Sequence, residues 1–221
     1  MSCYFTKLTM DNKVFIYLAG ESHCKYAQQI CDEMEYSAKI RGTGIARRSP
    51  VYLQEKMMEG KAVIALSAEG IWAGFCYMET WQSETYVANS GLIISPEFRN
   101  IGLARAIKKE IFRLSRRRYP NSKIYGLTTG LAVMRINSEL GYKPVTYSEL
   151  TSDEKFWDGC KSCVNYPILC SKEFKNCLCT AMLMDPSNIE PGSNLLSKTS
   201  KIIRRLITKK SIRSMIKTVP I

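Results

Sequence analysis

Short apolar runs alternate along the chain with longer segments in which apolar residues recur every three to four positions. Apolar runs bounded by Gly, Pro or Ser are typical of strands, and the longer period is typical of amphipathic helices. The pattern predicts strands at residues 13–19, 61–67, 71–81, 87–94, 123–128, 143–147 and 178–184. It predicts helices at residues 21–39, 50–59, 103–118 and 131–140. This β-α-α-β-β-β-α-β-α-β-β order favours an α/β fold, a mixed central sheet with helices on both faces.

The junction between the strand 87–94 and the helix that follows it is a candidate anion site. A helix that opens directly after a tight turn presents backbone N–H groups without partners, and its dipole favours negative charge there. Gly102 allows a phosphate to approach the backbone, and Arg99 adds positive charge. An ordinary βα turn would show the same local pattern. The predicted pyrophosphate-binding residues are Arg99, Asn100, Ile101, Gly102, Leu103 and Ala104.

The composition bounds the class of protein. A chain of 221 residues with 45% hydrophobic residues can bury the core of one full domain. We see no apolar run near the roughly 20 residues that a membrane span needs, and no secretory signal. The nine cysteines are therefore expected to stay reduced, which favours the cytoplasm. A single histidine, His23, makes a histidine-based triad or metal centre improbable.

The net charge of +12 is concentrated at the C-terminus. Residues 191–221 hold eight of the 32 basic residues and no acidic one, so the remainder of the chain carries only +4. We expect a globular domain over residues 1–186 and a linker with a basic amphipathic helical tail over residues 187–221. Such a tail suits an anionic membrane surface or nucleic acid, or else packs on its own domain with its lysines in solvent.

Two motifs resemble the GNAT superfamily of acyl-CoA-dependent N-acyltransferases. Arg99-Asn100-Ile101-Gly102-Leu103-Ala104 is similar to the family's R/Q-x-x-G-x-G/A loop, and Glu139-Leu140-Gly141-Tyr142 is similar to its E-x-L-G-F/Y. The resemblance covers about residues 10–150 in fold. It implies acetyl-CoA or succinyl-CoA as the acyl donor. It also implies that the backbone N–H groups of Leu92, Ile93 and Ile94 hold the pantetheine and the developing oxyanion, with a kink near Gly91 or simple packing of that glycine.

One position departs from this family. Many members have a tyrosine four residues before the glycine of the second motif, where it acts as general acid to the departing CoA thiolate. This chain has Asn137, whose amide gives up no proton at neutral pH. The role then falls to another group or to solvent, and the loss does not abolish activity in principle because a thiolate leaves readily.

A carboxylate is needed to deprotonate the acceptor amine. Glu79, on the strand before the motif strand, is the first candidate, and Glu84 is the second. Each can also be a solvated carboxylate at a strand end. The catalytic positions that we name are therefore Glu79 and Asn137.

The acceptor site is predicted at the loop between the first two helices. Arg41, Arg47 and Arg48 lie there among small residues, and guanidinium groups bind carboxylates bidentately. These arginines alternatively face solvent or meet a CoA phosphate. Runs such as SAKIRGTGIARRSP (37–50) and FWDGCKSCVNY (156–166) resemble a bacterial GNAT group associated with arginine biosynthesis. That group is regarded as candidate N-acetylglutamate or N-succinylglutamate synthases, which implies glutamate as the acceptor. A homodimer is a further expectation.

Four cysteines form two close pairs after residue 150. Two pairs of thiolates suit a tetrahedral zinc ion, although the second pair has only one spacer residue, and reduced, partly buried thiols are the other interpretation. Such a zinc would be structural, because four thiolates leave no open position. The candidate ligands are Cys160, Cys163, Cys177 and Cys179. A second function also stays open: a catalytically weak CoA-binding GNAT scaffold whose tail recruits nucleic acid or membrane.

Overall fold

The computed structural model describes residues 3–4, 13–42 and 46–188. Its chain divides after Pro186, and nearly all of the second unit, Ser187–Ile221, lies outside the described residues. The expected basic helical tail, its membrane or nucleic-acid partners and the domain boundary therefore stay predictions. Among the described residues, no helix has both the length and the apolar character to cross a bilayer.

A mixed sheet of eight described strands forms the centre of the first unit, in the order β1-β2-β3-β4-β5-β6-β8-β7. The only parallel pair among these strands is β5 with β6. The strands are β1 (Cys3–Tyr4), β2 (Val14–Leu18), β3 (Ala62–Ser67), β4 (Trp72–Trp81), β5 (Tyr86–Ile94), β6 (Lys123–Thr128), β7 (Lys143–Pro144) and β8 (Thr180–Met184). The predicted strand at 143–147 is shorter than expected, because the chain turns into a 3-10 helix at Tyr147–Glu149.

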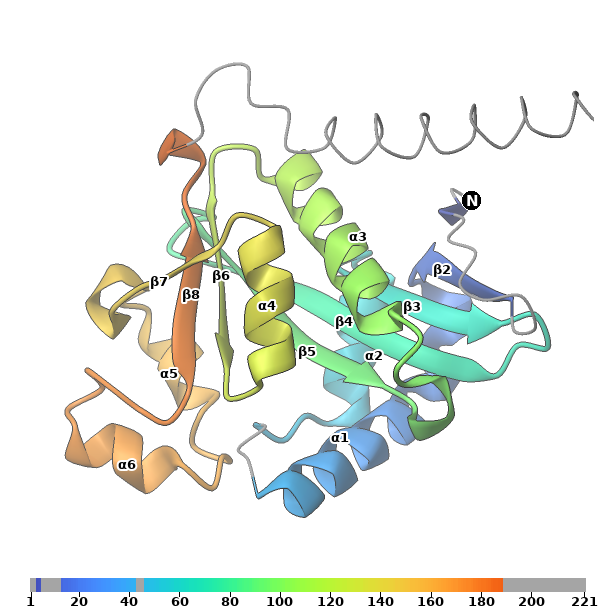
Figure 1. The fold of residues 1–221 in the computed structure, drawn as a ribbon, viewed down its shortest axis with the longest axis horizontal. Helices are drawn as coiled ribbons and strands as arrows, with labels where there is room; N and C mark the ends of the chain where they lie inside the picture. Colours follow the sequence, from blue (N-terminus) through green and yellow to red (C-terminus); the bar gives the residue numbers. More distant parts are fainter. Residues whose placement is uncertain (1–2, 5–12, 43–45, 189–221) are drawn as a thin grey trace, which may run out of the picture. The chain divides into compact units, whose positions relative to one another are not determined.

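Helices cover both faces of this sheet (Figure 1). The α-helices are α1 (Ala27–Arg41), α2 (Pro50–Met58), α3 (Leu103–Arg118), α4 (Leu131–Glu139), α5 (Glu154–Asp158) and α6 (Tyr166–Ser171). The 3-10 segments are η1 (Glu21–Tyr26), η2 (Pro96–Phe98), η3 (Tyr147–Glu149) and η4 (Pro186–Asn188). The mixed α/β sheet expected from the sequence is confirmed.

Three apolar clusters hold the helices to the sheet. The first joins α3 and α4 to one face through Ile107, Ile111 and their neighbours. The second joins α1 and α2 to the opposite face through residues such as Ile30 and Leu53. The third packs the segment with α5 and α6 onto the β6–β8 part of the sheet, around Tyr125. Both faces are therefore buried, which is why β4 is almost continuously apolar.

The strands β5 and β6 run together only at their beginning. Tyr86, Val87 and Ala88 pair with Lys123, Ile124 and Tyr125, and the ladder stops there. Beyond that point β5 continues along β4 to Ile94, and β6 continues along β8 to Thr128. We call this divergence, visible in Figure 1, the fork. In the fork, the backbone groups of β5 that face β6 have no ladder partner on that strand.

Candidate active site

A β-bulge lies where β5 enters the fork. Phe75 pairs with Ile93 and Tyr77 with Ser90, so two residues of β5, Gly91 and Leu92, stand opposite one residue of β4. A bulge leaves one residue outside the ladder and bends the strand. Gly91 has φ +64°, and a Cβ there would stand 2.4 Å from Cε1 of Tyr77. Only glycine fits this position, since the backbone is left-handed and the aromatic ring lies directly against it.

The bulge interrupts the pairing of β5 with β4. Of the predicted pantetheine-binding residues, Leu92 belongs to the bulge, while Ile93 and Ile94 pair again with β4. The Ile94 carbonyl accepts a hydrogen bond from Nε of Arg99, at 3.2 Å. Backbone donors for a thioester oxygen are therefore expected at Leu92, where the ladder is interrupted.

The predicted pyrophosphate loop connects β5 to α3. Asn100 and Gly102 both have left-handed φ, +63° and +82°, and Gly102 precedes the first residue of α3, Leu103. The first backbone bond back from the helix joins the Ala106 N–H to the Gly102 carbonyl at 3.2 Å. By helix geometry, the earlier N–H groups of the turn have no intrahelical acceptor. Asn100 through Ala104 thus form a compact turn at the positive end of the 16-residue helix α3.

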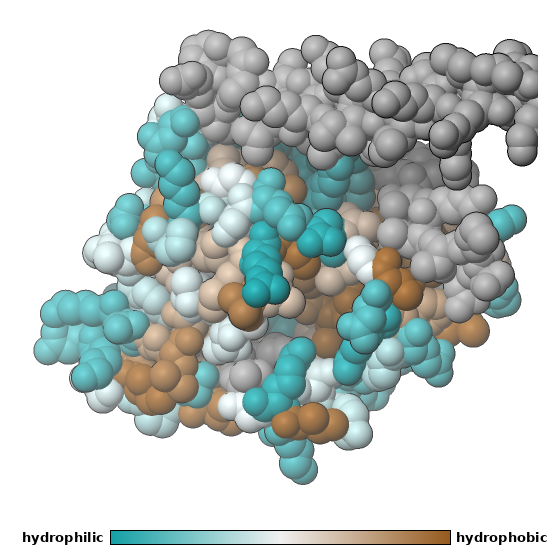
Figure 2. Space-filling view, viewed as in Figure 1, coloured by the Kyte–Doolittle hydropathy of each residue, from teal (hydrophilic) through white to brown (hydrophobic). Residues whose placement is uncertain are grey.

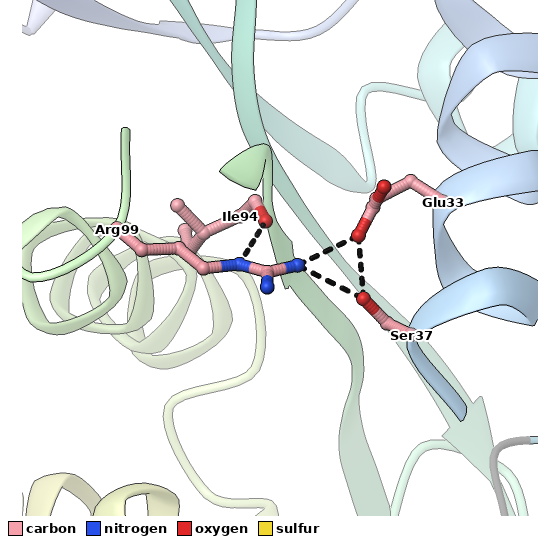
Figure 3. A network of polar contacts seen from close by, with 4 residues as sticks. All are labelled: Glu33, Ser37, Ile94 and Arg99. Carbon is pink, nitrogen blue, oxygen red and sulfur yellow. Dashed lines mark hydrogen bonds and ion pairs between the residues drawn. The ribbon is translucent and has the colours of Figure 1, made fainter. Parts of the chain in front are cut away.

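Arg99 does not point into that loop but toward α1 (Figure 3). Its Nη2 donates to Oε1 of Glu33 at 2.7 Å and to Oγ of Ser37 at 2.9 Å. The arginine thus joins the end of β5 to α1. Arg41, at the end of α1, also lies near this group: its pKa is lowered by burial first and then by the charge of Arg99.

A second polar network lies on the face covered by α1 and α2. The hydroxyl of Tyr52, in α2, donates to Oε1 of Glu79 in β4. Nε of Arg48 donates to the Tyr77 hydroxyl at 2.7 Å, and the Arg48 guanidinium lies 5.6 Å from the Tyr52 ring centre. Glu79 is only 9% exposed. A carboxylate and a guanidinium therefore stand together beside the bulge. We call Arg48, Tyr52, Tyr77 and Glu79 the acceptor network.

The charges in the acceptor network support one another. Burial opposes the cationic form of Arg48, but Tyr77 and Glu79 outweigh it, so the pKa of the guanidinium is raised. Burial, followed by the neighbouring charges, raises the pKa of the Tyr52 and Tyr77 hydroxyls. The network thus holds Arg48 as a cation and both phenols neutral at neutral pH. The Tyr125 hydroxyl, whose pKa is also raised by burial and by Glu79, is buried and has no hydrogen-bond partner among the described residues.

The structure separates the three predicted acceptor arginines. Arg48 is in the acceptor network, whereas the exposed Arg47 side chain pairs with Glu35 at 2.9 Å. The Arg47 backbone N–H donates to Oγ of Ser162, which connects this loop to the cysteine-rich segment. Arg41 belongs to the Arg99 group. Glu84, the second candidate base, is exposed in the turn between β4 and β5.

Asn137 is buried in α4, 1% exposed. Its Nδ2 lies 3.7 Å from the sulfur of Met182, and its Oδ1 has no partner among the described residues.

Sequence reasoning missed Lys108, which is 2% exposed on the sheet-facing side of α3. It also missed Tyr52, Tyr77 and Tyr125, whose side chains give no local signal. Lys108 could have been found, because it falls on the apolar face of the helix.

The predicted zinc site is not supported. In the described part of the chain, no three Cys, His, Asp or Glu side chains converge closely enough to hold a metal ion. Cys160, Cys163, Cys177 and Cys179 instead surround a small apolar cavity together with Leu127 and Trp157. Burial raises the pKa of Cys160 to about 11 and that of Cys179 to about 12, which keeps these thiols protonated. Apolar side chains gather around α6, at the lower left of Figure 2.

Comparison of the sequence finds no relative: no protein-family model and no curated protein matches it. Comparison of the structure does. N-acetylglutamate synthase from Neisseria gonorrhoeae, complexed with coenzyme A and N-acetyl-glutamate, is similar over 80% of this chain, with 16% identity and a TM-score of 0.57. The match covers 36% of the synthase chain, so this protein spans about a third of its length.

Shorter solved proteins match over nearly their whole length. Rv2747 from Mycobacterium tuberculosis, in complex with CoA and NLQ, has 16% identity and a TM-score of 0.55, covering 77% of this chain and 98% of its own. A GNAT superfamily phosphinothricin acetyltransferase from Sinorhizobium meliloti, in complex with AcCoA, has 13% identity and a TM-score of 0.52, covering 84% and 95%. The forked sheet, the bulge and these likenesses together show that the chain has the GNAT acetyltransferase fold.

Proposed function

We propose that this protein transfers an acetyl or succinyl group from acyl-CoA to the α-amino group of a dicarboxylic amino acid, with glutamate as the expected acceptor. The presence of Glu79 and Arg48 in one network with Tyr52 and Tyr77, beside the β5 bulge, carries this proposal. An α-amino acid offers an ammonium and a carboxylate a few bonds apart. A buried carboxylate and a half-buried guanidinium in the same network match these two charges, and guanidinium groups bind carboxylates bidentately.

The donor is assigned from the fold and the loop. Solved proteins of similar fold hold CoA or AcCoA, which supports an acyl-CoA donor. The turn from Asn100 to Ala104 offers backbone N–H groups at a helix N-terminus, which suits a pyrophosphate. The interrupted ladder at Leu92 offers a backbone donor for the thioester oxygen. We place the acyl group between this bulge and the acceptor network.

In this arrangement the reaction is a direct attack of the amine on the thioester carbonyl. Glu79 takes a proton from the acceptor ammonium, directly or through the Tyr52 hydroxyl that donates to it. Arg48 holds the acceptor carboxylate and so orients the amine toward the bulge. We expect this reaction in the cytoplasm, in keeping with the free thiols of the described cysteines.

An acceptor panel tests this assignment. CoA thiol release from acetyl-CoA and from succinyl-CoA is followed with glutamate, aspartate, the α-amide of glutamate and a simple alkylamine. We expect glutamate to be used best and the α-amide to be used poorly. Replacing Arg48 with Met removes a hydrogen bond to a charged group worth ~1.5–3 kcal/mol, so the kcat/KM for glutamate falls about 10- to 150-fold. Arg47→Met, on the same loop but paired with Glu35 at the surface, is the matched control and keeps its activity. Equal losses in both variants would contradict the assignment.

Two observations favour a second function. Arg99 is engaged by Glu33 and Ser37, and Asn137 supplies no acidic proton, which are features that a CoA-binding scaffold without activity would also show. Such a scaffold binds CoA and releases no thiol with any amine. The same panel, combined with a titration of CoA against the protein, separates the two functions.

A further inference from the structure

Lys108 is a buried ammonium without a buried counter-ion. It is 2% exposed, and its Nζ donates to the Asn89 carbonyl at 3.3 Å. The described residues supply Nζ with no carboxylate and no second hydrogen bond. Lysine side chains are almost never fully buried unless they are paired, because the desolvation of an ammonium is costly. A buried lysine in this position therefore calls for a functional explanation.

Lys108 lies at the point of the fork. Asn89 is the first residue of β5 beyond the last pair with β6, and Gly126 is the corresponding first residue of β6. A Cβ on Gly126 would stand 3.5 Å from the Asn89 carbonyl oxygen and 3.9 Å from Nζ of Lys108. The ammonium thus occupies the place where the two strands separate, on the face covered by α3. The acceptor network lies on the opposite face of the sheet, which α1 and α2 cover.

The groups around Lys108 are neutral. Cys76 in β4 has a pKa raised to about 11 by burial, and burial also raises the pKa of Tyr142, whose ring centre lies 5.6 Å from Nζ. Burial lowers the pKa of Lys108 itself, and the opposing influence of Cys76 is smaller than that of burial. The proton on Nζ is therefore released more readily than that of a solvated lysine.

Two hydroxyl donors near Lys108 are committed elsewhere. The Tyr142 hydroxyl donates to Oδ1 of Asn89 at 3.0 Å, and Oγ of Ser115 donates to the Ile111 carbonyl at 2.8 Å. The amide of Asn137 has its Nδ2 3.9 Å from the same Gly126 Cβ position, and an amide cannot act as an acid at neutral pH. Nζ of Lys108 is therefore the candidate proton donor at this point of the fork among the described residues.

We propose that Lys108 is the general acid of the acyl transfer, giving a proton from Nζ to the CoA sulfur as the carbon–sulfur bond breaks. This rests on the function proposed above. The acceptor ammonium loses one proton to Glu79, and its nitrogen then forms the bond to the carbonyl carbon and loses a second proton to solvent. The sulfur leaves with the electron pair of the broken bond and takes one proton from Lys108. Solvent then returns a proton to Lys108 and removes the one on Glu79, so the enzyme is restored.

The leaving group tests this role. With acetyl-CoA, whose alkyl thiolate benefits from protonation, Lys108→Met is expected to lower kcat about 100- to 10,000-fold. With an acetyl thioester of nitrothiobenzoate, whose aryl thiolate needs no proton, the wild type and the variant should differ by less than about 3-fold in kcat/KM. Lys109→Met, one position along the same helix, is the control and should match the wild type with both donors.

The outcomes separate a chemical role from a structural one. Equal losses with both donors, or unchanged turnover of acetyl-CoA by Lys108→Met, would overturn the proposal. Unfolding midpoints and CoA affinity, measured on each variant, show whether the fold is kept.

A second readout is the pH profile of kcat. The alkaline limb of the wild type should fall as Lys108 loses its proton, with Cys76 and Tyr142 still protonated, and the variant should lack that limb. If the wild type released no thiol from either donor in an acceptor-dependent way, the proposed function itself would fail. That result would overturn the role of Lys108 as well.

Discussion

Replacing Gly91 with alanine should damage both stability and acceptor binding. The substitution forces a side chain onto a backbone with φ +64°, which costs ~1–2 kcal/mol for a left-handed conformation. The new Cβ would also stand 2.4 Å from a ring atom of Tyr77, which is 1% exposed and cannot swing into solvent. Overpacking of this kind costs ~1–3 kcal/mol.

Two other glycines separate these contributions. Gly42 has φ +59° with no atom within 4 Å of a Cβ, so Gly42→Ala carries the backbone cost alone. Gly20 has φ −156° and equally open surroundings, so Gly20→Ala carries neither. We expect Gly91→Ala to lose ~2–5 kcal/mol of unfolding free energy, Gly42→Ala ~1–2 kcal/mol and Gly20→Ala close to none.

Thermal and urea unfolding of the three variants measure this difference. For a domain of this size the Gly91→Ala loss corresponds to a fall in Tm on the order of 5–15 °C. Because Tyr77 accepts the hydrogen bond from Arg48, displacement of its ring should also raise the KM for glutamate. A Gly91→Ala variant as stable as Gly42→Ala would refute the close approach of Tyr77 to the bulge, and with it the packing that we describe for the acceptor network.

Further variants probe the site's charges. Glu79→Gln should lower kcat about 100- to 10,000-fold, because the base is lost, while CoA affinity by titration stays unchanged; full activity would exclude Glu79. Glu33→Gln should free Arg99 for phosphate and strengthen CoA binding by up to about 5-fold, the value of one ion pair near the surface. Calorimetry measures this affinity, and weaker CoA binding in the variant would contradict the expectation. The lowered pKa of Lys108 means that the unfolded state binds more protons between that pKa and the ordinary lysine value, so this residue makes stability rise with pH across that window. The buried charge destabilises the wild type at low pH, so the excess stability of Lys108→Met over the wild type should shrink as pH rises. A pH-independent difference would contradict the burial of an ammonium.

Local patterns predicted the longer elements but not the short helices α5 and α6. The predicted strand at 13–19 is β2, and the predicted helix that Pro50 opens is α2, whose cap is the Ser49 hydroxyl accepting from the Tyr52 N–H. Periodicity and caps are properties of neighbouring residues, so they are legible in the sequence. The position of β8 between β6 and β7 was not, because it depends on pairing across more than 50 residues.

The site was predicted only where it is local. The Asn100–Ala104 turn follows from a strand, a glycine and a helix in succession. The orientation of Arg99 does not, because Glu33 and Ser37 are more than 60 residues away along the chain. The same holds for Arg48, which the sequence could not distinguish from Arg47. The spacing of the cysteines indicated zinc, but spacing does not reveal whether thiols converge, and here they surround apolar side chains.

The central claim is that acyl transfer to an amino acid takes place at the fork. It is tested most directly by the rate of CoA thiol release from acetyl-CoA with and without glutamate, with the N-acyl product identified by mass. We predict a saturable, glutamate-dependent release in which one acylated amino acid forms per thiol, and which Glu79→Gln slows by about 100-fold or more. Tight CoA binding without acceptor-dependent release from either acetyl-CoA or succinyl-CoA would contradict the claim and favour a CoA-binding scaffold.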